Sequence, residues 1–137
     1  MCSSDLEDVG NADPHALPLA VAAAQAHELC GLPESRLAMA QAVTYLATAP
    51  KSKASYNGLG LAQQAVRERG SLPVPSSLRN PSSRVGRQLG WGRDYHDPHA
   101  AGGWLADHYL PDDLRGTHFY RPTRNGHEAK LADRLAT

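Results

Sequence analysis

Apolar side chains recur at helical spacing in three stretches of the first half of the chain. Over residues 13–31, leucines, alanines and Val21 cover most of a helix surface, with Asp13 as a natural N-cap, Pro14 at the first helical position and Gly31 at the end. A second stretch, 32–50, ends at Pro50. A third, 52–70, keeps the spacing through its middle. The pattern therefore predicts three helices, the first of them largely buried.

The second half of the chain is less regular. Residues 82–90 predict a short helix and residues 124–137 a final helix, whereas 91–103 combine aromatic side chains, histidines and glycines in a long ordered loop. No strand pair with hairpin turn chemistry occurs. We therefore predict an all-α fold, a compact bundle of about five helices with a loop segment near 90–103.

The polar, acidic residues 1–12 predict a flexible leader or a boundary remnant ahead of a single helical domain over 13–137. The chain has 137 residues, 41% hydrophobic and 20% charged, which is typical of a globular domain. No apolar run is long enough to span a bilayer, and no secretory leader opens the chain. The two cysteines, Cys2 and Cys30, are no disulfide framework and favour a reducing, cytoplasmic setting.

Charge is unevenly distributed although the formal net charge is zero. Residues 51–93 carry eight Lys and Arg side chains against the single acid Glu68, and acidic segments flank them on both sides. Such a basic middle segment is suited either to an anionic polymer or to acidic faces of the same chain or of a second copy. The candidates for DNA or anion contact are Lys51, Lys53, Arg79, Arg84, Arg87 and Arg93.

Aromatic side chains lie among these basic residues. Arginine with tryptophan or tyrosine suits base stacking on nucleic acid, and it is equally favoured at protein–protein interfaces. The candidate interface residues are Tyr45, Tyr56, Trp91, Tyr95, Trp104 and Tyr109.

The stretch Lys51-Ser52-Lys53 raises the question of serine catalysis. Serine–lysine hydrolases place the lysine three positions after the serine, and no serine of this chain has that spacing, since Ser55 follows Ser52 at that distance. Ser52 instead predicts the N-cap of the third helix. Two lysines at a helix N-terminus are unfavourable unless an anion, either a phosphate or an acidic side chain, meets them there.

Other catalytic and cofactor motifs are weak or missing. His96, His99 and His108 lie among aspartates, but the pattern lacks paired cysteines or an HExxH helix, so ordered loop hydrogen bonds are favoured over zinc. No GxxxxGK[ST] sequence occurs, so the chain has no P-loop and is not expected to hydrolyse a nucleotide. We identify no catalytic, nucleotide-binding or metal residue.

Six segments in order carry a family resemblance over nearly the whole chain: EDVGNADPHAL with AVAAAQA, GLPESRLAMAQAVTYLATAPKSKASY, VPSSLRN, PHAAGGW, YLPDDLRG and FYRPTRNGHE. Together they resemble the C-terminal part of the RarA/MgsA family of AAA-type ATPases, which are replication-associated recombination proteins related to the Werner-helicase-interacting ATPases.

The resemblance implies a non-catalytic helical domain that drives homotetramer formation, with the P-loop, ATP and Mg²⁺ on an upstream domain. It implies a DNA-dependent parent ATPase in the bacterial cytoplasm, associated with the nucleoid and acting at replication forks in recombination and repair near single-strand-binding protein or other replisome components, with no membrane partner. The alternatives are a stand-alone nucleic-acid-binding module and a small metal-dependent or serine hydrolase using His96, His99 and His108, or Ser52 with Lys51.

Overall fold

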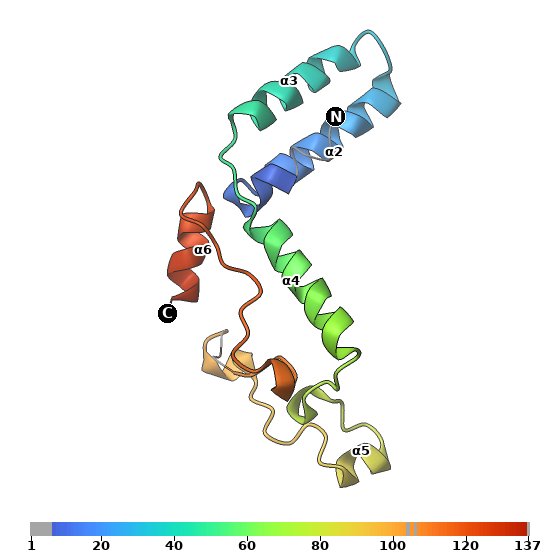
Figure 1. The fold of residues 1–137 in the computed structure, drawn as a ribbon. Helices are drawn as coiled ribbons and strands as arrows, with labels where there is room; N and C mark the ends of the chain where they lie inside the picture. Colours follow the sequence, from blue (N-terminus) through green and yellow to red (C-terminus); the bar gives the residue numbers. More distant parts are fainter. Residues whose placement is uncertain (1–6, 104, 106, 137) are drawn as a thin grey trace. The chain divides into compact units, whose positions relative to one another are not determined.

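The computed structural model describes residues 7–103, 105 and 107–136 (Figure 1). These residues form helices, turns and irregular segments, and none of them lies in a β-strand. The all-α prediction is therefore confirmed. The chain divides into two compact units: unit 1 runs up to Gln64 and resumes at His118, and unit 2 is Ala65–Thr117.

Unit 1 is built on a hairpin of two helices. Helices α2 (Ala16–Cys30) and α3 (Ser35–Thr48) lie side by side and antiparallel, joined by a short turn (Figure 1). Both fall within the stretches where apolar periodicity predicted a helix. Alanines at the contact allow the two backbones to approach closely.

The start of α2 corrects one expectation. Asp13 is not its N-cap, because the helix begins at Ala16 after His15, which makes no side-chain cap. The Asp13 carboxylate accepts hydrogen bonds from the backbone N–H of His15 (3.0 Å) and from the Tyr45 hydroxyl (2.7 Å). Pro18 fits without breaking the helix, because the N–H groups of a first turn have no intrahelical partner.

The other predicted helices are also present. Helix α4 (Ala54–Arg69) follows the junction at Pro50, and its first part belongs to unit 1 and its last turns to unit 2. The remaining elements are the short helix α5 (Arg84–Gln88), the C-terminal helix α6 (Glu128–Leu135), and the 3-10 turns η1 (Gly10–Ala12), η2 (Ser76–Leu78), η3 (Pro98–Ala101) and η4 (Asp112–Leu114). The predicted loop segment near 90–103 therefore contains one 3-10 turn, η3.

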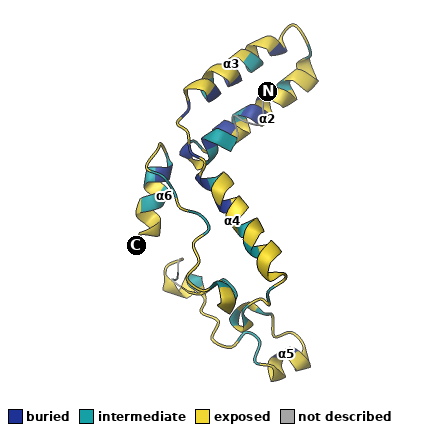
Figure 2. Ribbon diagram, in the orientation of Figure 1, coloured by how far each residue is buried: buried dark blue, intermediate teal, exposed yellow. Residues whose placement is uncertain are grey.

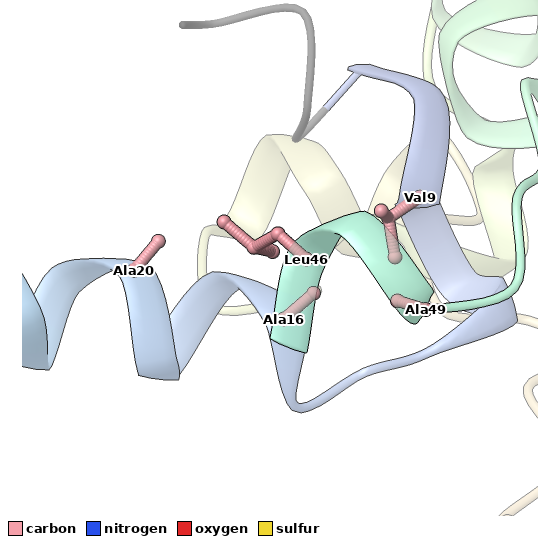
Figure 3. Close-up of a cluster of buried hydrophobic side chains, with 5 residues drawn as sticks. All are labelled: Val9, Ala16, Ala20, Leu46 and Ala49. Carbon is pink, nitrogen blue, oxygen red and sulfur yellow. The ribbon is translucent and has the colours of Figure 1, made fainter. Parts of the chain in front are cut away.

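The hydrophobic core of unit 1 consists of small side chains. Val9, Ala16, Ala20, Leu46 and Ala49 form one buried cluster (Figure 3). Residues 7–12 therefore belong to the ordered unit, since Val9 is fully buried, while the predicted flexibility of residues 1–6 concerns positions outside the described part of the chain.

Much of the apolar surface of α2 and α3 is exposed (Figure 2), so the prediction of a largely buried first helix is wrong. Leu17, Val21, Leu37 and Val43 are each between 47% and 80% exposed. Within the described residues, no helix combines the length and the apolar character needed to cross a membrane.

Candidate functional site

The candidate basic residues fall into the two units. Lys51 and Lys53 lie in unit 1, at the junction between α3 and α4, whereas the candidate arginines Arg79, Arg84, Arg87 and Arg93 all lie in unit 2. The basic segment of the sequence is thus two separate groups of side chains, and each has its own surroundings.

Lys53 meets acidic side chains of its own unit. Its ammonium lies 3.0 Å from a carboxylate oxygen of Asp8 and 3.3 Å from one of Glu7. The hydrogen bond to Asp8, together with the one to Glu7, raises the pKa of Lys53. Of the two anions the sequence allowed, it is therefore acidic side chains that meet this lysine.

Lys51 forms a hydrogen bond with the C-terminal end of α3. Its ammonium donates a hydrogen bond to the carbonyl of Leu46, in the last turn of that helix. A cation at a helix C-terminus is favourable, because the last carbonyls carry partial negative charge and lack intrahelical partners. Lys51 therefore interacts with the C-terminal end of α3, and Lys53 forms ion pairs with the acidic residues that precede α2.

Ser52 is buried between these two lysines, at 5% exposed. Its Oγ donates to Oε2 of Glu128 at 2.7 Å and accepts from the backbone N–H of Ala54 at 3.2 Å. The hydroxyl therefore accepts from the first N–H of α4 and anchors the C-terminal segment. The predicted N-cap was one residue early, because the helix begins at Ala54 and its N-cap position is Lys53.

Glu128 is the residue that sequence reasoning missed. Its side chain is fully buried. Oε2 accepts hydrogen bonds from the Ser52 hydroxyl and from both the backbone N–H and the hydroxyl of Thr123, each at 2.7 Å, and Oε1 accepts one from the Tyr120 hydroxyl at 2.9 Å. Burial by itself raises the pKa of the Glu128 carboxyl, but the hydrogen bonds from Thr123, Ser52 and Tyr120 outweigh it and leave the pKa lowered.

The segment FYRPTRNGHE supplies the rest of this junction. Asn125 donates its side-chain amide to the carbonyl of Lys51 at 2.9 Å, and the backbone N–H of His127 donates to the carbonyl of Ala12 at 2.7 Å. A Cβ on Gly126 would collide with the carbonyl of Ala12 and with the ring of Pro50. Residues 8–13, 50–54 and 119–128 come together here, and we call this region the Glu128 junction. In the sequence, only the family motif FYRPTRNGHE pointed to it.

The Glu128 junction borders a surface pocket of about 340 Å³ lined by Asp8, Lys51, Ser52, Lys53, Thr123 and Asn125. The Lys53 ammonium is already paired with carboxylates, and that of Lys51 with a carbonyl. The Ser52 hydroxyl both donates and accepts a hydrogen bond. Nothing in this arrangement activates a nucleophile, because the hydroxyl faces a carboxylate whose lowered pKa makes it a weak base. The geometry supports a structural role for Ser52.

Arg79 and Trp91 contact each other within unit 2. The Arg79 guanidinium lies 5.5 Å from the centre of the Trp91 ring, and its Nε donates to the carbonyl of Val74 at 2.7 Å. Gly86 packs on the same indole, where an added Cβ would lie 2.7 Å from a ring carbon. Trp91 therefore has much of its ring covered within unit 2. Arg79 and Trp91 line a pocket of about 460 Å³.

The other candidate arginines are exposed. Arg87 donates to the carbonyls of Pro81 and Ser82, both at 3.3 Å. Among the ion pairs of the described residues, none involves Arg84, Arg87 or Arg93. In the described structure, therefore, no carboxylate forms an ion pair with any of these three guanidinium groups.

The histidines of the loop do not converge. Nδ1 of His96 lies 3.1 Å from Oδ2 of Asp107, and this hydrogen bond lowers the pKa of Asp107. The His99 backbone N–H donates to Asp97, and that of His108 to Asp107. Across residues 7–103, 105 and 107–136, no three His, Cys, Asp or Glu side chains group as metal ligands.

The aromatic candidates differ in exposure. Tyr45 is half-buried and donates to Asp13, which raises the pKa of Tyr45, whereas Tyr56, Tyr95 and Tyr109 are exposed. The Tyr56 ring has the Lys53 ammonium 6.0 Å from its centre. Trp104 lies outside the described residues.

Comparison with known proteins gives consistent matches over the whole chain. A family model described as the MgsA AAA+ ATPase C terminal matches residues 1–137. Replication-associated recombination protein A of Coxiella burnetii is 44% identical over 131 residues, which is 94% of this chain and 30% of that protein.

Two further relatives match at greater distance. Replication-associated recombination protein A of Escherichia coli K12 is 40% identical over 132 residues, 95% of this chain and 30% of that protein. The ATPase WRNIP1 of Dictyostelium discoideum is 35% identical over 116 residues, 83% of this chain and 13% of that protein. The chain therefore spans about 30% of the length of the bacterial relatives.

Proposed function

The chain belongs to the family of MgsA AAA+ ATPase C-terminal domains, and from that membership we propose that it is the non-catalytic assembly domain of a DNA-dependent ATPase. ATP and Mg²⁺ belong to a domain upstream of it, and four copies associate through this domain. The parent acts in the cytoplasm, in replication-fork maintenance and recombination, near replisome components such as single-strand-binding protein.

The main support for the assembly role is that the α2–α3 hairpin exposes apolar side chains and contains few charged residues. Among Asp, Glu, Lys and Arg, helix α2 contains only Glu28 and helix α3 only Arg36. The exposed faces carry Leu17, Val21 and Val43 instead. Burying one such side chain contributes about 1.5–3 kcal/mol, so a partner that covers several of them is strongly favoured.

The test is the oligomeric state of this chain and of a hairpin variant, Val21→Glu with Val43→Glu. Sedimentation velocity over a wide concentration range is expected to give a homotetramer for the unmodified chain and a monomer for the variant, since burying an unpaired carboxylate is costly. Ser71→Glu with Ser82→Glu adds the same charge to exposed positions of unit 2 and serves as the control. A monomeric unmodified chain at tens of micromolar would contradict the assembly role.

A DNA contact by unit 2 is the second function we propose. It is supported by the exposure of Arg84, Arg87 and Arg93 and by the lack, in the part of the chain that the structure describes, of an ion pair at any of them. Fluorescence anisotropy with single-stranded and forked DNA should show weak, salt-sensitive binding that Arg84→Glu with Arg87→Glu weakens further. Unchanged anisotropy would assign these arginines to protein contacts instead.

A further inference from the structure

Helix α4 contains two glycines, and only one of them is explained by the chain itself. Gly58 is buried, and a Cβ there would lie 3.1 Å from the carbonyl oxygen of Phe119, so the close passage of the C-terminal segment favours a glycine. Gly60 is exposed, and a Cβ there would meet no atom within 4 Å. Glycine in the middle of a helix lowers helix stability, and none of the described residues offers a compensating contact at Gly60.

The surface around Gly60 has the shape of a helix-packing hole. A pocket of about 420 Å³ surrounds Gly60, lined by Tyr56, Asn57, Leu59, Leu61, Gln63 and Gln64. With Gly60 they form two adjacent diamonds at spacing i, i+3, i+4 and i+7, which are 56, 59, 60, 63 and 57, 60, 61, 64. Four residues at this spacing make the hole that receives a knob side chain from a facing helix. We call this feature the Gly60 notch.

The Gly60 notch is uncharged. From Ala54 to Val66 helix α4 contains no Asp, Glu, Lys or Arg, and Tyr56, Leu59 and Leu61 are 55%, 60% and 49% exposed. A charged occupant would lose its hydration there, and the Lys53 ammonium, 6.0 Å from the centre of the Tyr56 ring, is already paired with Glu7 and Asp8. The electrostatics of the hole therefore select a neutral, apolar knob.

The α2–α3 hairpin is the uncharged, apolar surface that matches this hole. Its exposed Leu17, Val21, Leu37 and Val43 belong to the same compact unit as the Gly60 notch, where Tyr56, Leu59 and Leu61 are likewise exposed in the described structure. We propose that the notch receives an apolar side chain from the α2–α3 hairpin of a second copy. This inference rests on the proposed assembly role.

The first test enlarges the residue at the floor of the notch. Gly60→Leu is compatible with the isolated subunit, because the space at its Cβ is open and leucine is a better helix former than glycine. We expect circular dichroism to retain the helix content, and sedimentation velocity to show a dissociation constant at least tenfold higher. Lys130→Leu places the same side chain on an exposed position of α6 and should leave the dissociation constant unchanged.

The second test identifies the occupant. In a background of Cys2→Ser and Cys30→Ser, a Gly60→Cys chain is mixed with chains carrying one cysteine each at Leu17, Val21, Leu37 or Val43, and oxidised. A disulfide between the two different chains at one or more of the four positions supports the hairpin as the occupant. Crosslinks only between two Gly60→Cys chains, or no mixed crosslink at all, would overturn it.

The outcomes separate this inference from the assembly role. An assembled unmodified chain whose dissociation constant is unaffected by Gly60→Leu overturns the notch contact and leaves the assembly role intact. A monomeric unmodified chain overturns the assembly role, and the proposed occupant of the notch with it.

Discussion

A single buried carboxylate ties the distant parts of unit 1 together. Glu128 accepts hydrogen bonds from Ser52, which is 76 residues away, and from Tyr120 and Thr123. Because unit 1 has a core of small side chains, such polar contacts supply much of its specificity of packing. The serine that first suggested catalysis is thus a structural partner of this glutamate.

The first prediction concerns the removal of this carboxylate. Glu128→Ala leaves several buried donors without an acceptor and should lower the free energy of unfolding by about 3 kcal/mol. Glu128→Gln should cost less, because the amide keeps one acceptor oxygen. Urea denaturation measures both effects. Asp133→Ala removes an exposed carboxylate of α6, which pairs with Arg124 ahead of the helix, and should cost less than about 1 kcal/mol. Equal losses in Glu128→Ala and Asp133→Ala would refute the structural role of Glu128.

The second prediction concerns acid pH. The folded pKa of Glu128 lies below its ordinary value of 4.5, so the unfolded chain binds this proton more readily, and stability is lost as pH falls below about 4.5. Asp13, whose pKa is lowered first by the hydrogen bond from Tyr45, adds to the same loss at slightly lower pH. In denaturation curves between pH 7 and pH 3, Glu128→Gln should lose less stability than the unmodified chain. Curves that stay parallel throughout would contradict the linkage.

At the scale of elements, the local sequence was sufficient to predict those helices whose bounds depend on residues close together in the chain. The prolines and glycines that end helices, together with the spacing of apolar residues, predicted α2, α3 and α4 close to their observed bounds. The start of α2 was misplaced because Asp13 forms a tertiary hydrogen bond with Tyr45. Two features could not be read from the sequence, because both depend on contacts more than 40 residues apart: the Glu128 junction and the pairing of Lys53 with Glu7 and Asp8.

The third prediction contrasts the two glycines of α4. Gly58→Ala should destabilise the chain, because its Cβ would press on the backbone of Phe119, whereas Gly60→Ala should stabilise the separated subunit by about 0.5–1 kcal/mol through helix propensity. Both are measured by urea denaturation in the background of Val21→Glu with Val43→Glu, so that assembly does not contribute. Effects of the same sign at the two positions would show that the backbone contact at Gly58 does not govern the difference.

At the scale of the whole molecule, the basic segment of the sequence divides between the two units. Within that segment, Lys51 and Lys53 of unit 1 are matched by acids and a carbonyl, and the exposed Arg84, Arg87 and Arg93 belong to unit 2. The apolar hairpin and the Gly60 notch both belong to unit 1. The proposed assembly surface and the proposed DNA contact therefore involve different residues, and substitutions should separate them.

The fourth prediction follows from this separation. An assembled chain presents several copies of unit 2 to one nucleic acid, so its affinity for a long single strand should exceed that for a strand reaching one subunit by about 100-fold or more. The hairpin variant, Val21→Glu with Val43→Glu, should lose this gain on the long strand yet bind the short strand as the unmodified chain does. Arg84→Glu with Arg87→Glu should weaken binding to both strands and flatten the dependence on salt, since fewer counterions are released. Anisotropy titrations at several salt concentrations measure all three proteins, and an equal loss on both strands in the hairpin variant would place the DNA contact on the assembly surface instead of on unit 2.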